Sequence, residues 1–436
     1  MNGFVIAAPR SGSGKTLVTL GLLAALRDRG RAVAPAKTGP DYIDTAILAR
    51  AAGRPAINLD PWAMPPPRLA QLARRHAEAA DLLVVEGVMG LFDGAADGTG
   101  ATADLASALD LPVILVLDAE RQSHSIAALA HGFIGWRPGL RIAGLIVNRA
   151  GSQRHEAILR HALAAVPVPL LGVLPADPAL TLPARHLGLV LPDEIARFDD
   201  IVALAARAVA THLDLDRLLT LAVAATPAPP PAVAAAPLPP LGQRIAIARD
   251  AAFSFVYPHW LADWHAAGAE LSFFSPLADE APDPAADAVF LPGGYPELHG
   301  AQLAAAGDFQ ASLHAAAWRG ALLYGECGGF MVLGRSLTDR DGTTHPMAGL
   351  LPHASRIDRP RRVLGYRRLE HASPLPFPGL LRGHEFHYSS LDPVAGTPLF
   401  RATDALGTEL PPMGLREGRV MGSYAHIIDA EPNGQP

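Results

Sequence analysis

Residues 226–240 read TPAPPPAVAAAPLPP, and this segment constrains the fold of the chain more than any other. Proline lacks a backbone N–H and fixes φ, so such a run continues neither an α-helix nor a central strand. A segment rich in Pro and Ala instead forms an extended, semi-rigid spacer. We therefore predict two domains, residues 1–225 and 241–436, joined by a linker over residues 226–240. The length of 436 residues agrees, because a single hydrophobic core stops growing at roughly 250–300 residues.

On each side of this linker, β-like runs alternate with helical patterns. Such alternation predicts a parallel sheet covered by helices, so both domains are expected to be α/β. In the first half, the predicted strands are residues 4–8, 32–36, 82–86, 113–118 and 142–148, and the predicted helices include residues 16–29 and 104–108. In the second half, the predicted strands are residues 244–249, 270–274, 288–292 and 321–324, with helices near residues 258–267 and 302–319.

The composition argues against several classes of protein. The formal net charge of −6 is spread along the chain, which does not favour nucleic-acid binding. A single cysteine excludes an intrachain disulfide, and residues 1–10 lack the features of a signal peptide, so we expect a cytoplasmic protein. No apolar run reaches the roughly 18 residues of a membrane-spanning helix. Residues 356–368, RIDRPRRVLGYRR, are locally basic and are interpreted at this point as a solvated loop and strand edge.

Residues 9–16, PRSGSGKT, follow a predicted strand and open a predicted helix, which is the setting of a phosphate-binding loop. Backbone N–H groups and the positive end of the helix face phosphate oxygens in such a loop. We expect Lys15 to reach the β- and γ-phosphates and Thr16 to ligate Mg²⁺. Pro9 stands where the strict G-x-x-x-x-G-K-[ST] pattern has glycine, and Arg10 stands where partition ATPases have a signature lysine. The predicted ATP-binding residues are Ser11, Gly12, Ser13, Gly14, Lys15 and Thr16.

Acidic residues follow two other predicted strands of the first half. The string KTGPDYID contains Asp41 and Asp44, and the string VVEGVMGLFDG ends a strand in Glu86. Ligands of open α/β sheets gather at the carboxyl ends of the strands, so these carboxylates and Thr16 are candidates to share one Mg²⁺. The predicted metal ligands are Thr16, Asp41 and Glu86, with Asp44 as the alternative to Asp41. Each carboxylate has a second interpretation as a helix cap.

The only cysteine of the chain, Cys327, lies in the string GECGG after a predicted strand. The G-x-C-x-G spacing between a strand and a helix is typical of a nucleophile elbow, and the helix start is expected to favour a thiolate. His426, at the end of a late strand, is the candidate base, and the N–H groups of Gly294 and Gly328 are candidate oxyanion donors. Together these residues predict a thiol-dependent amide hydrolase, although a lone cysteine is more often a small buried hydrophobe.

The residue that orients His426 stays open at this point. Glutaminases of this kind often carry His-x-Glu, but position 428 is Ile. Asp429 is one residue too far and, on a strand, faces the other way.

Other polar positions give weaker signals. In GHEFHYS, His384 and His387 fall on opposite faces of a strand, and the spacing is not H-E-x-x-H, so we predict no zinc site there. Substrate contact and strand packing remain as alternatives for this string. Asn148 closes a predicted strand of the first half and is expected either to bind a base or to cap a loop.

The motifs taken together resemble a known family. The chain is similar to the cobyrinic or hydrogenobyrinic acid a,c-diamide synthases of corrinoid biosynthesis over nearly its whole length. The similarity is carried by GSGKT, KTGPDYID, EGVMGLFDG, GTGATADLA, LSFFSPLADE, LPGGYPEL, YGECGGFMVLG, GHEFHYS and GSYAHI. GPDYID with EGVMGLFDG is the most specific combination, whereas the elbow alone indicates only a class I glutamine amidotransferase.

The resemblance implies a P-loop synthetase domain like dethiobiotin synthetase, followed by a class I glutaminase domain of flavodoxin-like α/β fold. It implies that Cys327 is the nucleophile and His426 its base, and that the missing His-x-Glu acid is a property of the family. It also implies a synthetase site formed by Asp41, Tyr42, Asp44, Glu86 and Asp93.

The implied reaction is amidation of the a and c acetate carboxylates of hydrogenobyrinic or cobyrinic acid, with ATP and L-glutamine as co-substrates and Mg²⁺ as cofactor. An acyl phosphate and ammonia released from glutamine would be the intermediates. A polycarboxylate substrate would give the basic residues 356–368 a role as an electrostatic guide. The alternatives are a nickel-sirohydrochlorin a,c-diamide synthase, a cobyric acid synthase and, from another class, a partition-type regulatory ATPase. A homodimer is also expected, because α/β domains commonly dimerise.

Overall fold

The computed structural model of the chain describes residues 1–182, 184–185, 188–189, 191–222, 236–392 and 395–431. The chain divides into two compact units, Met1–Ala235 and Ala236–Pro436, called here the first and the second unit. Most of the predicted linker lies outside the described residues, and only residues 236–240 of it are described. The domain limits therefore stay a prediction, and each unit is described by itself.

The first unit is built on a seven-stranded parallel sheet with the order β3-β2-β4-β1-β5-β6-β7. Its strands are β1 (Gly3–Ala7), β2 (Val33–Thr38), β3 (Ile57–Leu59), β4 (Leu82–Glu86), β5 (Val113–Asp118), β6 (Ile142–Ala150) and β7 (Leu170–Pro175). A two-stranded ribbon of β8 (Ala184–Arg185) and β9 (Gly188–Leu189) is separate from it. The central strands are buried along their whole length, as expected of a sheet covered on both faces.

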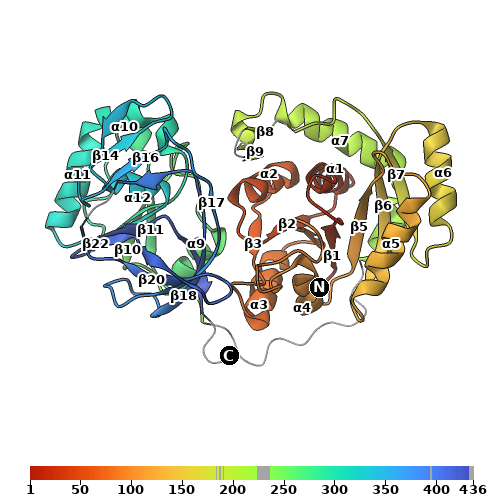
Figure 1. Cartoon of the computed structure of the whole chain (residues 1–436), viewed down its shortest axis with the longest axis horizontal. Helices are drawn as coiled ribbons and strands as arrows, with labels where there is room; N and C mark the ends of the chain where they lie inside the picture. Colours follow the sequence, from red (N-terminus) through yellow and green to blue (C-terminus); the bar gives the residue numbers. More distant parts are fainter. Residues whose placement is uncertain (183, 186–187, 190, 223–235, 393–394, 432–436) are drawn as a thin grey trace. The chain divides into compact units, whose positions relative to one another are not determined.

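Helices cover both faces of this sheet (Figure 1). Helix α1 packs against α2 and α7, α3 packs against α4, and α5 packs against α6. The helices are α1 (Lys15–Asp28), α2 (Tyr42–Ala52), α3 (Pro66–Ala77), α4 (Thr102–Leu109), α5 (Ser125–Trp136), α6 (Gln153–Leu163), α7 (Phe198–His212) and α8 (Leu215–Leu221), with a 3₁₀ turn η1 (Pro192–Glu194).

Helix α1 shows how the sequence positions the phosphate loop. The helix is rich in Leu and Ala, which favour helix, and it begins directly after Gly14, whose φ of 87° only glycine adopts easily. It ends before Gly30, where the N–H groups of Gly30 and Arg31 donate to the carbonyls of Arg27 and Leu26. Leu20, Leu22 and Leu23 of this helix are fully buried in the core. The loop of residues 9–14 is therefore held between a buried strand and a buried helix.

The second unit contains a six-stranded mixed sheet with the order β11-β10-β12-β13-β23-β22, in which only β22 runs antiparallel. Its strands are β10 (Arg244–Ala248), β11 (Glu270–Phe274), β12 (Ala288–Leu291), β13 (Leu322–Glu326), β22 (Leu415–Glu417) and β23 (Val420–Ser423). The helices of this unit are α9 (Pro258–Ala266), α10 (Gly300–Ala305), α11 (Gly307–Trp318) and α12 (Gly328–Leu333), with 3₁₀ turns η2 (Pro276–Ala278) and η3 (Pro296–Leu298).

Two further sheets, which the sequence did not predict, complete the second unit: a mixed one, in which β14 and β16 run parallel, and an antiparallel one. A four-stranded sheet has the order β15-β14-β16-β19, and a five-stranded sheet has the order β21-β20-β17-β18-β24. Their strands are β14 (Ser336–Thr338), β15 (Thr344–Pro346), β16 (Ala354–Arg356), β17 (Val363–Glu370), β18 (Leu380–His387), β19 (Ser390–Leu391), β20 (Phe400–Thr403), β21 (Glu409–Met413) and β24 (His426–Ala430). Strand β18 pairs with β24 so that His384 lies opposite His426.

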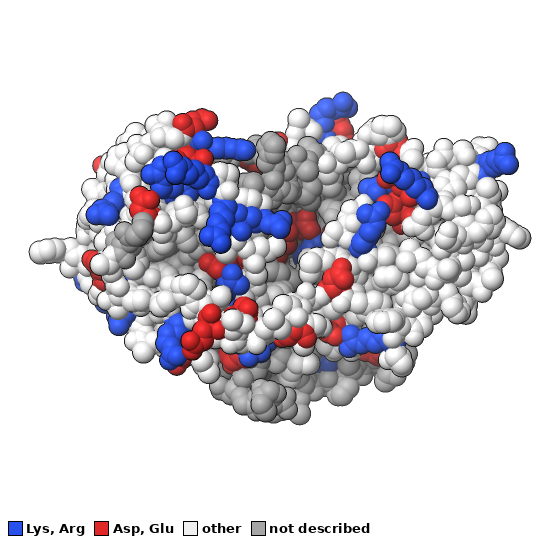
Figure 2. Space-filling view, viewed as in Figure 1, with Lys and Arg blue, Asp and Glu red and all other residues white. Residues whose placement is uncertain are grey.

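Charged side chains of both signs are interspersed on the visible face in Figure 2. In the part of the chain that the structure describes, no helix combines the length and the apolar character that crossing a bilayer requires.

Candidate active sites

The phosphate loop of the first unit has the conformation that its glycines allow. Gly12 and Gly14 have φ values of 79° and 87°, and a Cβ on Gly14 would come within 2.2 Å of the Asn148 side-chain nitrogen. Asn148 donates from Nδ2 to the carbonyl oxygen of Ser13 over 3.1 Å. Of the two predicted roles for Asn148, base binding and loop capping, the structure thus favours loop capping. The hydroxyl of Ser13 in turn donates to the carbonyl of Arg10 over 3.0 Å.

Lys15 opens α1 and is largely buried, at 8% exposure. Its ammonium donates to the carbonyl of Met89, a residue held at a φ of 48°, and lies 3.5 Å from the carbonyl of Arg10. Burial, followed by the charge of Lys37, lowers the pKa of Lys15 to about 8. An anion at the loop would restore the charged form, because an opposite charge favours it. The position of Lys15 therefore suits a lysine whose charged form is stabilised when phosphate binds at the loop.

A buried cluster of charges lies at the carboxyl ends of β2 and β4. Lys37 and Glu86 are paired positions of these parallel strands, and Nζ of Lys37 donates to Oε1 of Glu86 over 2.8 Å. Lys37 also forms an ion pair with Asp44, and Thr16 donates from Oγ1 to the same oxygen of Glu86 over 2.8 Å. Burial by itself would lower the pKa of Lys37, but Asp44 and Glu86 outweigh it and raise that pKa above its usual value. The structure therefore brings together Thr16, Asp44 and Glu86 around a lysine.

The other predicted residues of the synthetase site have more exposed positions. Asp41 is the N-cap of α2, where Oδ1 accepts from the N–H of Asp44 over 2.8 Å, and Tyr42 begins this helix. Asp93 is exposed and closes a turn by accepting from the N–H of Gly90 over 2.9 Å. Its charge acts on Lys15 and raises the pKa of that lysine. The helix-cap interpretation therefore applies to Asp41. Asp93 acts on the phosphate loop through its negative charge, which favours the charged form of Lys15.

In the second unit, Cys327 forms the sharp turn between β13 and α12. Its backbone has φ 47° and ψ −102°, a region that non-glycine residues rarely adopt, and its N–H donates to the carbonyl of Ser423 over 2.8 Å. A Cβ on Gly329 would come within 1.8 Å of the Leu291 carbonyl, so this position requires glycine. The turn has the strained geometry of a nucleophile elbow.

The two predicted oxyanion donors are neighbours in space. A Cβ on Gly328 would lie 3.1 Å from the backbone nitrogen of Gly294 and 2.8 Å from Cδ of Pro296. His426 borders the same place, because a Cβ on Gly293 would come within 2.4 Å of its ring. The chain reaches this place directly, since β23 pairs with β13 and leads within three residues into His426. The elbow at Cys327, the backbone at Gly293 and Gly294, and the ring of His426 therefore lie next to one another.

Burial, followed by the charge of Glu297, raises the pKa of the Cys327 thiol well above its usual value, while the N–H of Gly328 lowers it. The expectation of a preformed thiolate is therefore wrong for this structure, because burial outweighs the short helix. Glu297 itself has a buried Oε2 without a hydrogen-bond partner among the described residues, and burial raises its pKa to about 7. The resting site thus holds a protonated thiol that needs a base.

His426 is buried, and its Nδ1 lies 3.7 Å from Oε2 of Glu326, the residue before Cys327. The ring of His384 stacks on that of His426 with centroids 5.0 Å apart. His387, from the same string, stacks on Tyr424 at 4.2 Å and lies 3.3 Å from Oε1 of Glu385. The histidines of GHEFHYS thus pack around the candidate base and its neighbours.

Comparisons with known proteins cover both units. Residues 4–190 match the model of the CobQ/CobB/MinD/ParA nucleotide binding domain, and residues 244–434 match that of the CobB/CobQ-like glutamine amidotransferase domain. Hydrogenobyrinate a,c-diamide synthases of Brucella abortus, Rhizobium meliloti and Rhodobacter capsulatus are 55%, 53% and 49% identical to this chain. The alignments cover 98% of this chain and 99%, 99% and 98% of those proteins. The chain belongs to the hydrogenobyrinate a,c-diamide synthase family.

This membership confirms the expected family, the enzyme class and the pair of α/β units. Among solved structures, chloroplast FtsY of Physcomitrella patens matches with a TM-score of 0.32 at 16% identity, over 47% of this chain and 65% of that chain. A likeness of this size carries no argument about the synthase family.

The first unit contains two of the oxygen ligands that a Mg²⁺ site at the phosphate loop needs. Oε2 of Glu86 is buried and has no hydrogen-bond partner among the described residues, and the Thr16 hydroxyl lies beside the same carboxylate. The described residues contain no cluster of three or more His, Cys, Asp or Glu that could hold a metal. This fits a Mg²⁺ that takes one carboxylate and one hydroxyl and completes its shell with phosphate and water.

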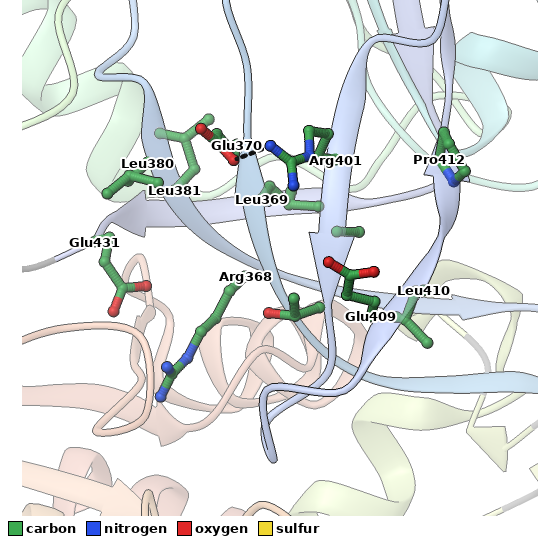
Figure 3. A pocket seen from close by; sticks show the side chains of 12 residues that line it. Arg368, Leu369, Glu370, Leu380, Leu381, Arg401, Glu409, Leu410, Pro412 and Glu431 are labelled. Atoms are coloured by element: carbon green, nitrogen blue, oxygen red, sulfur yellow. Dashed lines mark ion pairs between the residues drawn. The ribbon is translucent and has the colours of Figure 1, made fainter. Parts of the chain in front are cut away.

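An open pocket lies on the five-stranded sheet of the second unit (Figure 3). Arg368 and Arg401 line it together with Glu370, Glu409 and Glu431, and Arg401 pairs with Glu370. Three carboxylates against two guanidiniums do not suit a polycarboxylate such as the family's substrate.

The basic segment is only partly available as an electrostatic guide. Arg356 pairs with Asp358, and the buried Arg367 pairs with Glu385. Arg359, Arg361, Arg362 and Arg368 are exposed.

Sequence reasoning missed three residues of these sites: Lys37, Glu297 and Glu326. Lys37 lies one residue before the end of β2, after four apolar residues, and this is the one local signal that could have found it. The other two lie inside the strings LPGGYPEL and GECGG but carry no spacing that marks them as functional.

Proposed function

We propose that this chain amidates the a and c acetate carboxylates of hydrogenobyrinic acid in cobalamin biosynthesis, using ATP and glutamine. One observation carries the proposal: a hydrogenobyrinate a,c-diamide synthase of Brucella abortus aligns with 98% of this chain at 55% identity. The alignment thus includes both the phosphate loop and the elbow. The cobalt-free corrin is chosen over cobyrinic acid because this relative is named for it.

In the second unit, Sγ of Cys327 attacks the side-chain amide carbon of glutamine, and His426 takes the thiol proton. The N–H groups of Gly294 and Gly328 stabilise the oxyanion that forms. His426 then gives its proton to the departing nitrogen, which leaves as ammonia. Water hydrolyses the remaining thioester and releases glutamate. The buried, protonated thiol supports this order, since proton removal accompanies the attack.

In the first unit, an acetate carboxylate of the macrocycle attacks the γ-phosphate of ATP, and ADP leaves. Lys15 neutralises charge on the transferring phosphoryl group, and the N–H groups of residues 11–16 hold the phosphates. Thr16 and Glu86 are the residues that would hold Mg²⁺, with Asp41 as a further candidate ligand. When bound, Mg²⁺ would offset phosphate charge. Ammonia then displaces phosphate from the acyl phosphate and forms the amide, and a second round gives the diamide.

Amidation in parallel reactions tests the proposal and separates it from its rivals. The purified protein is incubated with MgATP, glutamine and either hydrogenobyrinic acid, cobyrinic acid or nickel sirohydrochlorin, and products are read by mass spectrometry. We expect two amides on hydrogenobyrinic acid. Cys327→Ser should abolish this with glutamine but not with free ammonia, because only the glutaminase step needs the thiol. Diamide on only one of the other tetrapyrroles would reassign the substrate, and ATP hydrolysis without any amide would refute the synthase.

A further inference from the structure

The second unit contains an acid beside the candidate base that the sequence pattern did not reveal. Oε2 of Glu326 lies 3.7 Å from Nδ1 of His426, and both side chains are only 2% exposed. This separation is too long for a hydrogen bond in the resting structure. Catalytic contacts of resting enzymes are often long and tighten when substrate binds. The two groups are therefore in place for a hydrogen bond from Nδ1–H to the carboxylate.

Glu326 is itself held in position by two donors. Its Oε1 accepts from the hydroxyl of Tyr324 over 2.9 Å and from the backbone N–H of Ile427 over 3.1 Å. Tyr324 stays a donor over the working pH range, because burial and the charge of Glu326 raise its pKa well above the usual value. Both donors bind the same oxygen, which leaves Oε2 turned to His426. This anchors the carboxylate from two strands, β13 and β24.

The position where the family of glutaminases often has an acid cannot serve here. Ile428 is fully buried, and its carbonyl accepts from the Trp260 indole over 3.1 Å. Asp429 faces another neighbour, since it is paired in register with Arg382 of β18. An acid two residues after His426 would therefore be placed in the hydrophobic core.

The charge state of His384, whose ring stacks on that of His426, also affects the candidate base. Burial first, and then the charges of His426 and Arg367, lower the pKa of His384 well below its usual value. His384 is thus neutral at neutral pH and adds no positive charge beside a protonated His426. Its Nδ1 lies 3.4 Å from the Tyr257 hydroxyl, which fixes the plane of the ring.

We propose that Glu326 is the positioning residue of His426, supplied by the residue before the nucleophile in place of the His-x-Glu acid. It holds the tautomer with a proton on Nδ1, so that the unprotonated Nε2 takes the thiol proton of Cys327. Once His426 carries that proton, the nearby carboxylate stabilises the imidazolium. The inference rests on the proposed glutaminase roles of Cys327 and His426.

Glu326→Gln is the sharpest test, because glutamine keeps the size of the side chain and an oxygen for Tyr324 and Ile427. Its amide would then present a donor to Nδ1 and favour the wrong tautomer. We expect glutamine kcat to fall by roughly 100- to 10,000-fold, the upper figure being the loss seen when the orienting acid of a serine protease becomes an amide, with little change in the KM for glutamine. The ratio of glutamine-dependent to ammonia-dependent amidation should fall by the same factor.

A spectroscopic measurement separates positioning from a merely structural role. In ¹⁵N-histidine spectra, with His426 assigned from its loss in His426→Gln, we expect the Nδ1–H tautomer in the native protein and the Nε2–H tautomer in Glu326→Gln. Glu409→Gln, which removes an exposed carboxylate of the same unit, is the matched control and should leave the tautomer unchanged.

Tyr324→Phe keeps the proposal testable if Glu326→Gln does not fold. It removes one donor to Oε1, so glutamine kcat should fall by about 3- to 10-fold. Glutamine kcat within threefold of native in Glu326→Gln, together with an unchanged tautomer, would overturn the inference. Glutamine hydrolysis that persists in Cys327→Ser would instead refute the proposed glutaminase site.

Discussion

Lys37 donates to Glu86 over 2.8 Å inside the first unit, and neither side chain is more than 3% exposed. The two residues occupy paired positions of β2 and β4, so the parallel register places them on the same face of the sheet. Asp44 forms an ion pair with the same ammonium. One buried lysine therefore balances two carboxylates next to the phosphate loop.

Lys37→Met should destabilise the first unit by about 3–5 kcal/mol, because it leaves buried carboxylates without their cation. Equilibrium urea unfolding measures this loss of unfolding free energy. Lys15→Met is the matched control, since Lys15 forms its hydrogen bonds with backbone carbonyls and pairs with no carboxylate among the described residues. The prediction fails if both variants unfold at the same urea concentration.

ATP binding should take up a proton near pH 8. Lys15 has a pKa of about 8 in the free protein, so about half of the molecules hold it neutral at that pH. Phosphate favours the charged form, and binding should weaken as the pH rises above 8. Calorimetry at pH 8 in buffers of different ionisation enthalpy should give an uptake of about half a proton per ATP, and almost none at pH 6.5.

Lys15→Arg provides the control for this linkage. Arginine stays charged at all working pH values, so its ATP binding should show no proton uptake at pH 8. An equal uptake in both proteins would assign the proton to another group.

Cys327 should react slowly with iodoacetamide, because its raised pKa keeps the thiol protonated. The labelling rate should still rise between pH 8 and about 9.5, where a free thiol levels off. Glu297→Gln removes the neighbouring charge and should speed labelling at pH 8 by about 3- to 10-fold. Glu409→Gln should not change the labelling rate. Mass spectrometry measures the labelling of Cys327 directly, because the chain has one cysteine.

The sequence predicted those parts of the two sites that are formed by residues adjacent in the chain. The phosphate loop and the elbow are short strings between a strand and a helix, and the positive φ values of Gly12 and Gly14 are local requirements for glycine. Gly329 is required by the close approach of the Leu291 carbonyl, although the G-x-C-x-G spacing marks it in the sequence. Nothing distant has to be known to recognise them. The strands that precede both turns are buried and begin with mostly apolar residues, so the sequence predicted their type and position.

Pairs that depend on strand order could not be predicted. Lys37 meets Glu86 only because β2 lies beside β4 in the sheet. Glu326 faces His426 only because β23 pairs with β13 and then turns into β24. The five-stranded antiparallel sheet was missed because β17 and β18 mix buried and exposed positions without clean alternation.

His353 should make the second unit sensitive to acid. Its ring is fully buried, stacks on Phe330 at 4.0 Å and hydrogen-bonds from Nε2 to the Phe330 carbonyl over 3.0 Å. Burial lowers its pKa to about 4, below the value of about 6.5 in an unfolded chain. As the pH falls from 6.5, the unfolded chain therefore binds the proton first, so stability present above pH 6.5 is lost towards pH 4.

The expected loss from His353 is about 2 kcal/mol of unfolding free energy between pH 7 and pH 5. His353→Gln keeps a donor for the Phe330 carbonyl but does not titrate, so urea unfolding at the two pH values should differ by about 2 kcal/mol less than in the native protein. His265→Gln removes an exposed histidine of the same unit and should leave the difference unchanged. Equal acid sensitivity of native protein and His353→Gln would show that another buried group, such as His384, dominates.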